Sequence, residues 1–161
     1  MSPLSILTHT PLWVWPVLAL IIGIGLKRTQ DRTVSAPRLV LMPLIILGLA
    51  GWNLAALGGS LTAMAGLGIG IVVGTSAGLT LESRAGTTQV SRGVVHLKGD
   101  WISLLVLLAI FAMRYATTVV SITAPAIGTS DACHFVTALL SGFFAFLTLS
   151  RTGLRLRVAY A

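Results

Sequence analysis

Four glycines at a stride of four residues constrain this chain more than any other feature. Gly66, Gly70, Gly74 and Gly78 lie inside one apolar run, residues 61–79. In water, each glycine in a helix interior would cost about 1 kcal/mol relative to alanine, so such a run should not stay helical. In a bilayer the backbone must satisfy its own hydrogen bonds, and glycine lets a second helix approach closely. The run therefore predicts a buried, closely packed span of a membrane helix bundle.

The overall composition supports a membrane protein. Of the 161 residues, 55% are apolar and 9% are charged, whereas globular domains carry about 25% charged residues. Eleven basic residues against four acidic ones give a net charge of +7, which in a soluble protein would suggest nucleic acid. Here the bases flank the apolar runs, so we expect the lipid bilayer as partner and no nucleic acid. Cys133 is the only cysteine, which excludes an internal disulfide.

The predicted fold class is an all-α polytopic membrane bundle of about five helices, forming a single integral membrane domain over residues 1–161. The spans are predicted at about residues 11–27, 37–57, 61–81, 101–123 and 132–150. The short turn at Gly58 predicts that the second and third spans are antiparallel neighbours. Alternating polarity in the segment 80–100 predicts a short β-hairpin at the membrane surface, although a loop without strands would show similar polarity.

Basic residues predict the orientation. Four lie in the connector 27–38, three in the segment 80–100 and three in the tail, at Arg151, Arg155 and Arg157. The other connections have none. Because basic segments stay on the cytoplasmic side, the N-terminus is predicted outside and the C-terminus inside, and the tail arginines are interpreted as orientation signals.

One charged residue, Arg114, lies inside a predicted span. Burying it costs about 2.5 kcal/mol or more, and such residues usually face a protein interior or an aqueous cavity. Asn53 and Tyr115 are predicted to lie at a similar depth, His134 belongs to a polar stripe on the last span, and Asp131 lies just above that stripe. Together with Arg114 they predict an outward-facing polar pocket that binds a substrate.

Two functions of different classes follow. The first is a small transporter or permease-like protein in which Arg114 attracts an anionic or polar solute; a structural contact of Arg114 with Asp131 or Asn53 would explain the residue without a ligand. The alternative is a non-enzymatic accessory or assembly subunit that docks a membrane partner, or a second copy, through the glycine face or the segment 80–100. Packing of the glycine face within the chain is the simpler expectation.

Chemistry beyond binding has little support in the sequence. No phosphate loop and no set of nucleophile, base and orienting residue is recognisable, so we expect no enzyme. No cofactor and no metal site are predicted, and haem or metal ligation through His134 is kept only as a third hypothesis.

The N-terminal half resembles a group of small, uncharacterised bacterial inner-membrane proteins. The resemblance rests on the opening Thr-Pro-Leu-Trp-Val-Trp at residues 10–15 and on a basic first connector that contains Pro37 and Arg38. It extends through the glycine span and the pair Arg114 and Tyr115. These proteins have unknown function, so the resemblance implies a multi-pass protein of the bacterial inner (cytoplasmic) membrane and no particular activity.

Overall fold

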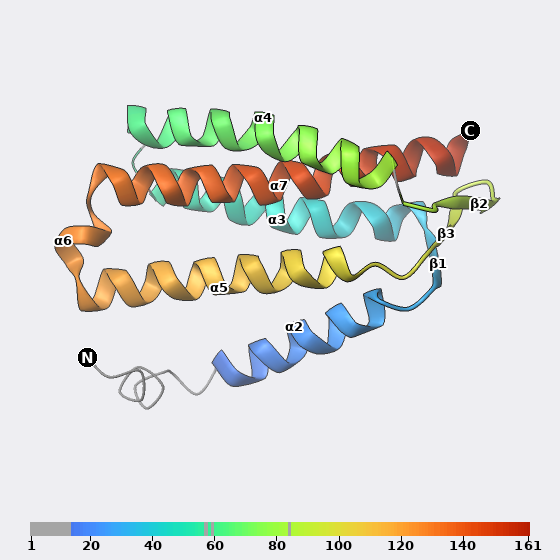
Figure 1. The fold of residues 1–161 in the computed structure, drawn as a ribbon, viewed down its shortest axis with the longest axis horizontal. Helices are drawn as coiled ribbons and strands as arrows, with labels where there is room; N and C mark the ends of the chain where they lie inside the picture. Colours follow the sequence, from blue (N-terminus) through green and yellow to red (C-terminus); the bar gives the residue numbers. More distant parts are fainter. Residues whose placement is uncertain (1–13, 57, 59, 84) are drawn as a thin grey trace.

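The structure is a computed structural model that describes residues 14–56, 58, 60–83 and 85–161. Long helices run side by side, with a small sheet at one end (Figure 1). In chain order the described elements are α2 (Val14–Arg28), β1 (Arg32–Ser35), α3 (Ala36–Ala56), α4 (Leu61–Ser83), β2 (Thr88–Ser91), β3 (Val94–Leu97), α5 (Trp101–Thr123), α6 (Pro125–Gly128) and α7 (Asp131–Tyr160). The beginning of the first predicted span lies outside the described residues.

Four of the described helices, α3, α4, α5 and α7, are long and apolar enough to cross a membrane. Large apolar side chains cover their outer surfaces; Leu41, Val72 and Leu105 are each more than 60% exposed. A bilayer would cover such a surface. Helix α2 has 15 residues, fewer than the roughly 20 that a span needs. The structure therefore supports four spans, and the first predicted span, at residues 11–27, stays a prediction.

Helix α4 packs along α7, which lies between α3 and α4 (Figure 1). All four glycines of the stride are buried. A Cβ added at Gly70 would meet the carbonyl oxygen of Leu139, and one added at Gly74 would meet that of Phe143. The prediction that the second and third spans pack as neighbours is wrong, because the glycines let α4 approach the main chain of α7 instead. The turn at Gly58 joins α3 and α4 without placing them face to face.

The sheet has three antiparallel strands in the order β1, β3, β2. Strands β2 and β3 lie in the segment 80–100, and Gly93 between them adopts a positive φ of 79°. Strand β1 comes from the first connector, which the sequence did not indicate as a strand. The segment is therefore part of a three-stranded sheet rather than a separate hairpin.

The C-terminal turns of α7 pack on this sheet. Ala159 of α7 forms an apolar cluster with Leu39, Val95 and Leu97, and its carbonyl oxygen accepts a hydrogen bond from the backbone N–H of Gly93 (2.9 Å). These contacts explain why α7 continues to residue 160, past residue 150 where the fifth span was predicted to end.

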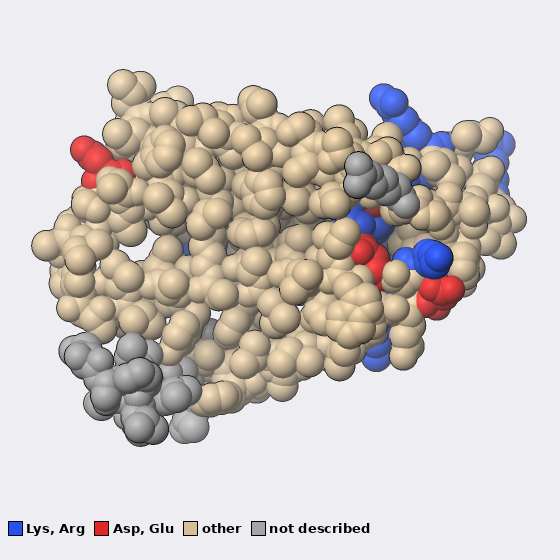
Figure 2. Space-filling model, viewed as in Figure 1, with Lys and Arg blue, Asp and Glu red and all other residues tan. Residues whose placement is uncertain are grey.

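Helix α2 packs mainly on α5, where Gly25 lies against the side chain of Leu104. This pair lies beside the layer of α3, α7 and α4, and Figure 2 shows openings through the molecule beside α5. On the face shown in Figure 2, most of the Lys and Arg atoms gather at the end that carries the sheet. We call the end formed by β1, β2, β3 and the C-terminal turns of α7 the basic end.

Candidate functional site

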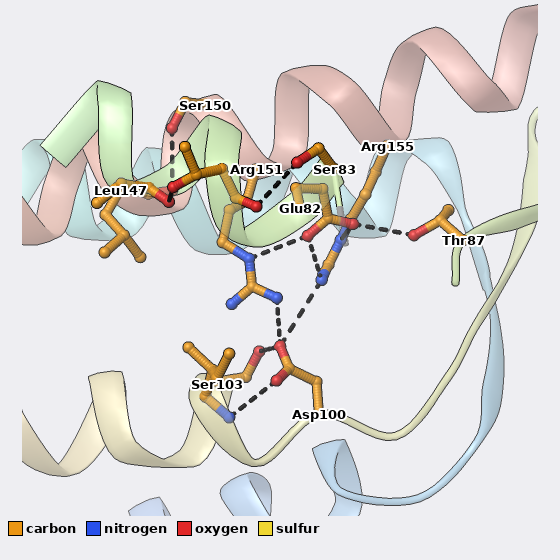
Figure 3. A network of polar contacts seen from close by, with 12 residues as sticks. Glu82, Ser83, Thr87, Asp100, Ser103, Leu147, Ser150, Arg151 and Arg155 are labelled. Carbon is orange, nitrogen blue, oxygen red and sulfur yellow. Dashed lines mark hydrogen bonds and ion pairs between the residues drawn. The ribbon is translucent and has the colours of Figure 1, made fainter. Parts of the chain in front are cut away.

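A buried group of two carboxylates and two arginines holds the basic end together (Figure 3). Glu82, in the last turn of α4, accepts hydrogen bonds from Nε of Arg151 (3.0 Å) and from Nε and Nη2 of Arg155 (2.7 and 2.9 Å). The hydroxyl of Thr87 donates a further bond to Glu82 (2.9 Å). Glu82 and Arg151 are each only 5% exposed. Because a buried ion is costly unless it is paired, the removal of one member should be strongly destabilising.

Asp100 connects α5 to this group. It caps the N-terminus of α5, accepting hydrogen bonds from the backbone N–H of Ile102 (2.8 Å) and the hydroxyl of Ser103 (3.1 Å). Its carboxylate also accepts a bond from Nη2 of Arg151 and lies 3.9 Å from Nη2 of Arg155. Burial alone would raise the pKa of Asp100, but the hydrogen bond and charge of Arg151, helped by the N–H of Ile102, hold this pKa below its usual value. The Arg151 guanidinium thus bridges α4 and α5.

A cavity of about 300 Å³ opens beside these ion pairs, between α2, β1, α3, α5 and α7. Five arginines line it: Arg28, Arg32, Arg38, Arg151 and Arg155. The last two contact the carboxylates described above. In the described part of the chain, no hydrogen bond or ion pair engages the side chains of Arg28, Arg32 and Arg38.

Arg28 shows most clearly that this cavity has unbalanced positive charge. Its Nε is buried and has no hydrogen-bond partner among the described residues. Burial, followed by the nearby charge of Arg32, lowers the pKa of Arg28 to about 10. Burial and the charge of Arg155 also lower the pKa of Arg32. Among the described residues, Asp31 forms no ion pair with these arginines; its carboxylate accepts a bond from the backbone N–H of Gly99 (2.6 Å).

The chemistry of this lining favours an anion. A guanidinium presents several N–H donors in a planar fork that matches the oxygens of a phosphate or carboxylate group. Leaving a buried donor unpaired costs about 1–3 kcal/mol, and more when the group is charged. An anion in the cavity would remove that cost for Arg28 and would offset the repulsion between the neighbouring arginines.

The structure brings Arg114 and Asn53 together. The Nη1 of Arg114 donates to Oδ1 of Asn53, and Nη2 donates to the carbonyl oxygen of Leu49 (3.2 Å). The side-chain amide of Asn53 in turn donates to the hydroxyl of Ser141 (3.2 Å). The cavity beside them has a volume of about 20 Å³, which is room for about one water molecule. In this conformation Arg114 is engaged by α3 and has little space for a solute.

The other residues predicted for the outward pocket make different contacts. Asp131 is exposed at the start of α7 and accepts a hydrogen bond from the hydroxyl of Thr62 (3.4 Å). The ring of Tyr115 stacks on that of Phe111 with a centroid separation of 6.5 Å. His134 is half-buried near the start of α7, and no three His, Cys, Asp or Glu side chains of the described residues lie together as metal ligands would.

Sequence reasoning missed the group formed by Glu82, Asp100, Arg151 and Arg155. Two signals pointed to it. Residues 151 and 155 are four apart and so share one face of a helix, and two of the chain's four acidic residues lie near the two ends of the segment 80–100. Spacing alone could not pair them, because Glu82 lies 69 and 73 positions from its two arginines.

Comparisons with known proteins agree with the resemblance noted in the sequence. An uncharacterised protein of Pasteurella multocida (strain Pm70) is 39% identical over 44 residues, which cover 27% of this chain and 34% of the relative. The match therefore spans about a third of that protein. No solved structure matches the chain. A family model described as a family of unknown function (DUF6622) matches residues 2–161, so the chain belongs to this family.

Proposed function

We propose that this protein is a multi-pass protein of the bacterial inner membrane that binds an anionic group in the arginine-lined cavity at its basic end. The observation that carries the proposal is the set of Arg28, Arg32 and Arg38 around a cavity of about 300 Å³, where no described carboxylate pairs with them. With five spans and the N-terminus outside, the positive-inside rule puts this end on the cytoplasmic side. The ligand would then arrive from the cytoplasm or from the inner leaflet.

Binding should stabilise the folded protein. The lowered pKa of Arg28, about 10, means that the folded, ligand-free protein disfavours the charged guanidinium. An anion that interacts with the folded state and not with the unfolded chain raises the melting temperature by mass action.

The test is a thermal unfolding titration of the purified protein in a neutral detergent, with pyrophosphate as the probe anion. We expect the melting temperature to rise with pyrophosphate concentration in the wild type and to stay constant in Arg28→Gln. The matched control is Arg92→Gln, which removes the same charge from an exposed residue of the turn between β2 and β3 and should keep the response. Equal responses in both variants, or no response in the wild type, would overturn the proposal.

A permease-like role is the second candidate, and one observation favours it. The arginine-lined cavity and the small cavity at Arg114 are both lined by α3, α5 and α7, and they share Ile46. Ile46 would then separate a cytoplasmic compartment from the outward pocket around Arg114. Radiolabelled phosphate efflux from proteoliposomes tests this role: Ile46→Ala should raise the rate and Arg114→Gln should lower it, and efflux no faster than from protein-free liposomes would contradict it.

The accessory-subunit alternative receives less support. The glycine face of α4 is covered by α7 of the same chain, so it is not free to dock a partner. We therefore do not extend the proposal to a docking role for this face or to a homo-oligomer built on it.

The orientation has a test of its own. Cys133 lies near the start of α7, at the end opposite the sheet, and Ser91 lies exposed in β2. A membrane-impermeant maleimide applied to intact cells should label the wild type at Cys133 and should not label Cys133→Ser/Ser91→Cys, while both proteins should react after solubilisation. The reverse pattern on intact cells would show that the C-terminus faces outward.

A further inference from the structure

The cavity at the basic end has an apolar wall as well as an arginine lining. On α3 the wall consists of one helical face, with residues at the spacing i, i+3, i+4 and i+7. These are Leu39, Met42, Pro43 and Ile46, and Val106 and Leu107 of α5 line the same cavity. From residue 39 to residue 46 the helix rises about 10 Å. The apolar wall therefore leads from the arginines into the membrane-spanning part of the bundle.

The two helices that provide this wall pack on other partners. Helix α3 packs on α7 and α5 packs mainly on α2. In the described part of the chain the main chains of α3 and α5 make little contact, and Arg114 links the two helices through its hydrogen bonds to Asn53 and Leu49. Figure 2 shows openings beside α5. The cavity lies between these two helices, and residues of both helices line it.

We propose that the ligand of this cavity is an anionic amphiphile, which is a phosphate or carboxylate group carried by an alkyl chain. The head group lies among Arg28, Arg32 and Arg38, and the chain lies against the groove of α3 and α5. This inference rests on the proposed function, which concerns the anionic group alone. An inorganic anion would leave the apolar wall without a partner, and a neutral lipid would leave the three arginines unpaired.

The size of the cavity fits this class of ligand. A volume of about 300 Å³ is at the lower end of the range for small-molecule sites. It accommodates a head group with the first part of a chain, and a longer chain would continue along the groove between α3 and α5. Apolar contact then adds to the charge interaction, because each buried methylene tightens binding by roughly threefold to fourfold.

The experiment is a chain-length series of water-soluble ligands on the protein in a neutral detergent: inorganic phosphate, methyl phosphate, butyl phosphate and hexyl phosphate. We expect hexyl phosphate to bind more than tenfold tighter than methyl phosphate. Met42→Trp, which fills the groove, should remove this gain and keep the binding of inorganic phosphate. Its control is Leu41→Trp at the neighbouring residue, which is 61% exposed and should keep both. If Met42→Trp fails to fold, Leu107→Phe provides a smaller filling substitution with the same expected result.

The outcomes separate this inference from the proposed function. Equal affinity along the series, with loss of binding in Arg28→Gln, would overturn the proposal that the ligand is an amphiphile and would leave the proposed anion site intact. Affinity that rises with chain length but is unchanged in Arg28→Gln would overturn both, because it would reflect partition into the detergent.

A second arm distinguishes a membrane lipid from a soluble ester. The protein is placed in nanodiscs of phosphatidylcholine with or without phosphatidic acid. If the groove takes its ligand from the bilayer, phosphatidic acid competes with hexyl phosphate. Unchanged hexyl phosphate binding would overturn a bilayer source and assign the site to a soluble ester.

Discussion

The two sides of α7 are built in opposite ways. Toward α4, the stride of glycines brings the helices into main-chain contact. Toward α5, the molecule stays open and contains a cavity of about 300 Å³. Two polar bridges join α5 to the other helices. At the basic end Arg151 forms ion pairs with Glu82 and Asp100, and farther along the bundle Arg114 donates a hydrogen bond to Asn53.

The difference between the two sides suggests that the side facing α4 contributes to stability and the side facing α5 provides room for a ligand. In lipid there is no hydrophobic drive between apolar helices, so close packing of small residues holds a pair together and leaves no room for a ligand. The open side lacks such packing, and ion pairs and hydrogen bonds hold it instead. The two bridges also differ, because the first is buried and ionic, whereas the second pairs a half-buried arginine with neutral groups.

The largest effect should come from breaking the ionic bridge with Glu82→Gln. Arg151 and Arg155 would lose the carboxylate that both contact, which should lower the free energy of unfolding by roughly 3–5 kcal/mol. Denaturant unfolding in detergent, followed by circular dichroism, measures this change. Asp131→Asn, at an exposed carboxylate of the opposite end, is the control and should have little effect; similar small losses in both variants would contradict a stabilising role for the bridge.

Gly70→Ala should disrupt the close packing of α4 against α7. The new Cβ would meet the main chain at Leu139 and Phe143, so the helices must move apart, at a cost of about 1–3 kcal/mol. Gly68→Ala is the matched control on the same helix, since a Cβ there meets nothing within 4 Å. If both alanines are tolerated equally in the same unfolding assay, the glycines do not hold α4 against α7.

Acid should weaken the ionic bridge through Asp100. Its pKa in the folded protein is below the usual value of 3.8, so its contribution to stability is complete above that value and is lost as the pH falls through the folded-state pKa. The melting temperature should therefore drop in acid, and Asp100→Asn should have a lower melting temperature at neutral pH and a weaker acid dependence. If the melting temperatures of the two proteins changed with pH in the same way, Asp100 would not contribute to the ionic bridge.

The smallest effect is expected from the second bridge. Arg114→Leu removes hydrogen bonds to Asn53 and Leu49 but also removes a costly charge from a span, so the two contributions should nearly cancel, to within about 1 kcal/mol. The same unfolding measurement checks this. A loss as large as that of Glu82→Gln would show that both bridges carry equal weight.

Helix positions could be predicted from the sequence better than helix partners. The span expected at residues 101–123 corresponds to α5 (Trp101–Thr123), because a long apolar run between polar residues is a local signal. The partner of α4 is not a local property. The short turn at Gly58 suggested that α4 packs on α3. The structure shows instead that Gly70 of α4 lies against the main chain of α7.

The candidate site was less predictable for the same reason. Arg114 and Asn53 could be expected to meet, since both are rare polar groups at similar depth. Arg28 and Arg32 are easy to find in the basic connector, but from the sequence alone their charge indicates only the orientation of the protein in the membrane. Their role in a binding site depends on which arginines the nearby carboxylates pair with. Glu82 and Asp100 pair with Arg151 and Arg155, and only the tertiary structure reveals that.

The most direct test of an anion site at the basic end compares Arg28 with Arg114 in one titration. Arg28→Gln and Arg114→Gln each remove one positive charge, from the open cavity and from the small cavity respectively. With pyrophosphate as the probe and melting temperature as the readout, we predict that Arg28→Gln loses the stabilisation and that Arg114→Gln retains it. Loss in Arg114→Gln with an unchanged response in Arg28→Gln would contradict a binding site at the basic end and place the anion in the outward pocket.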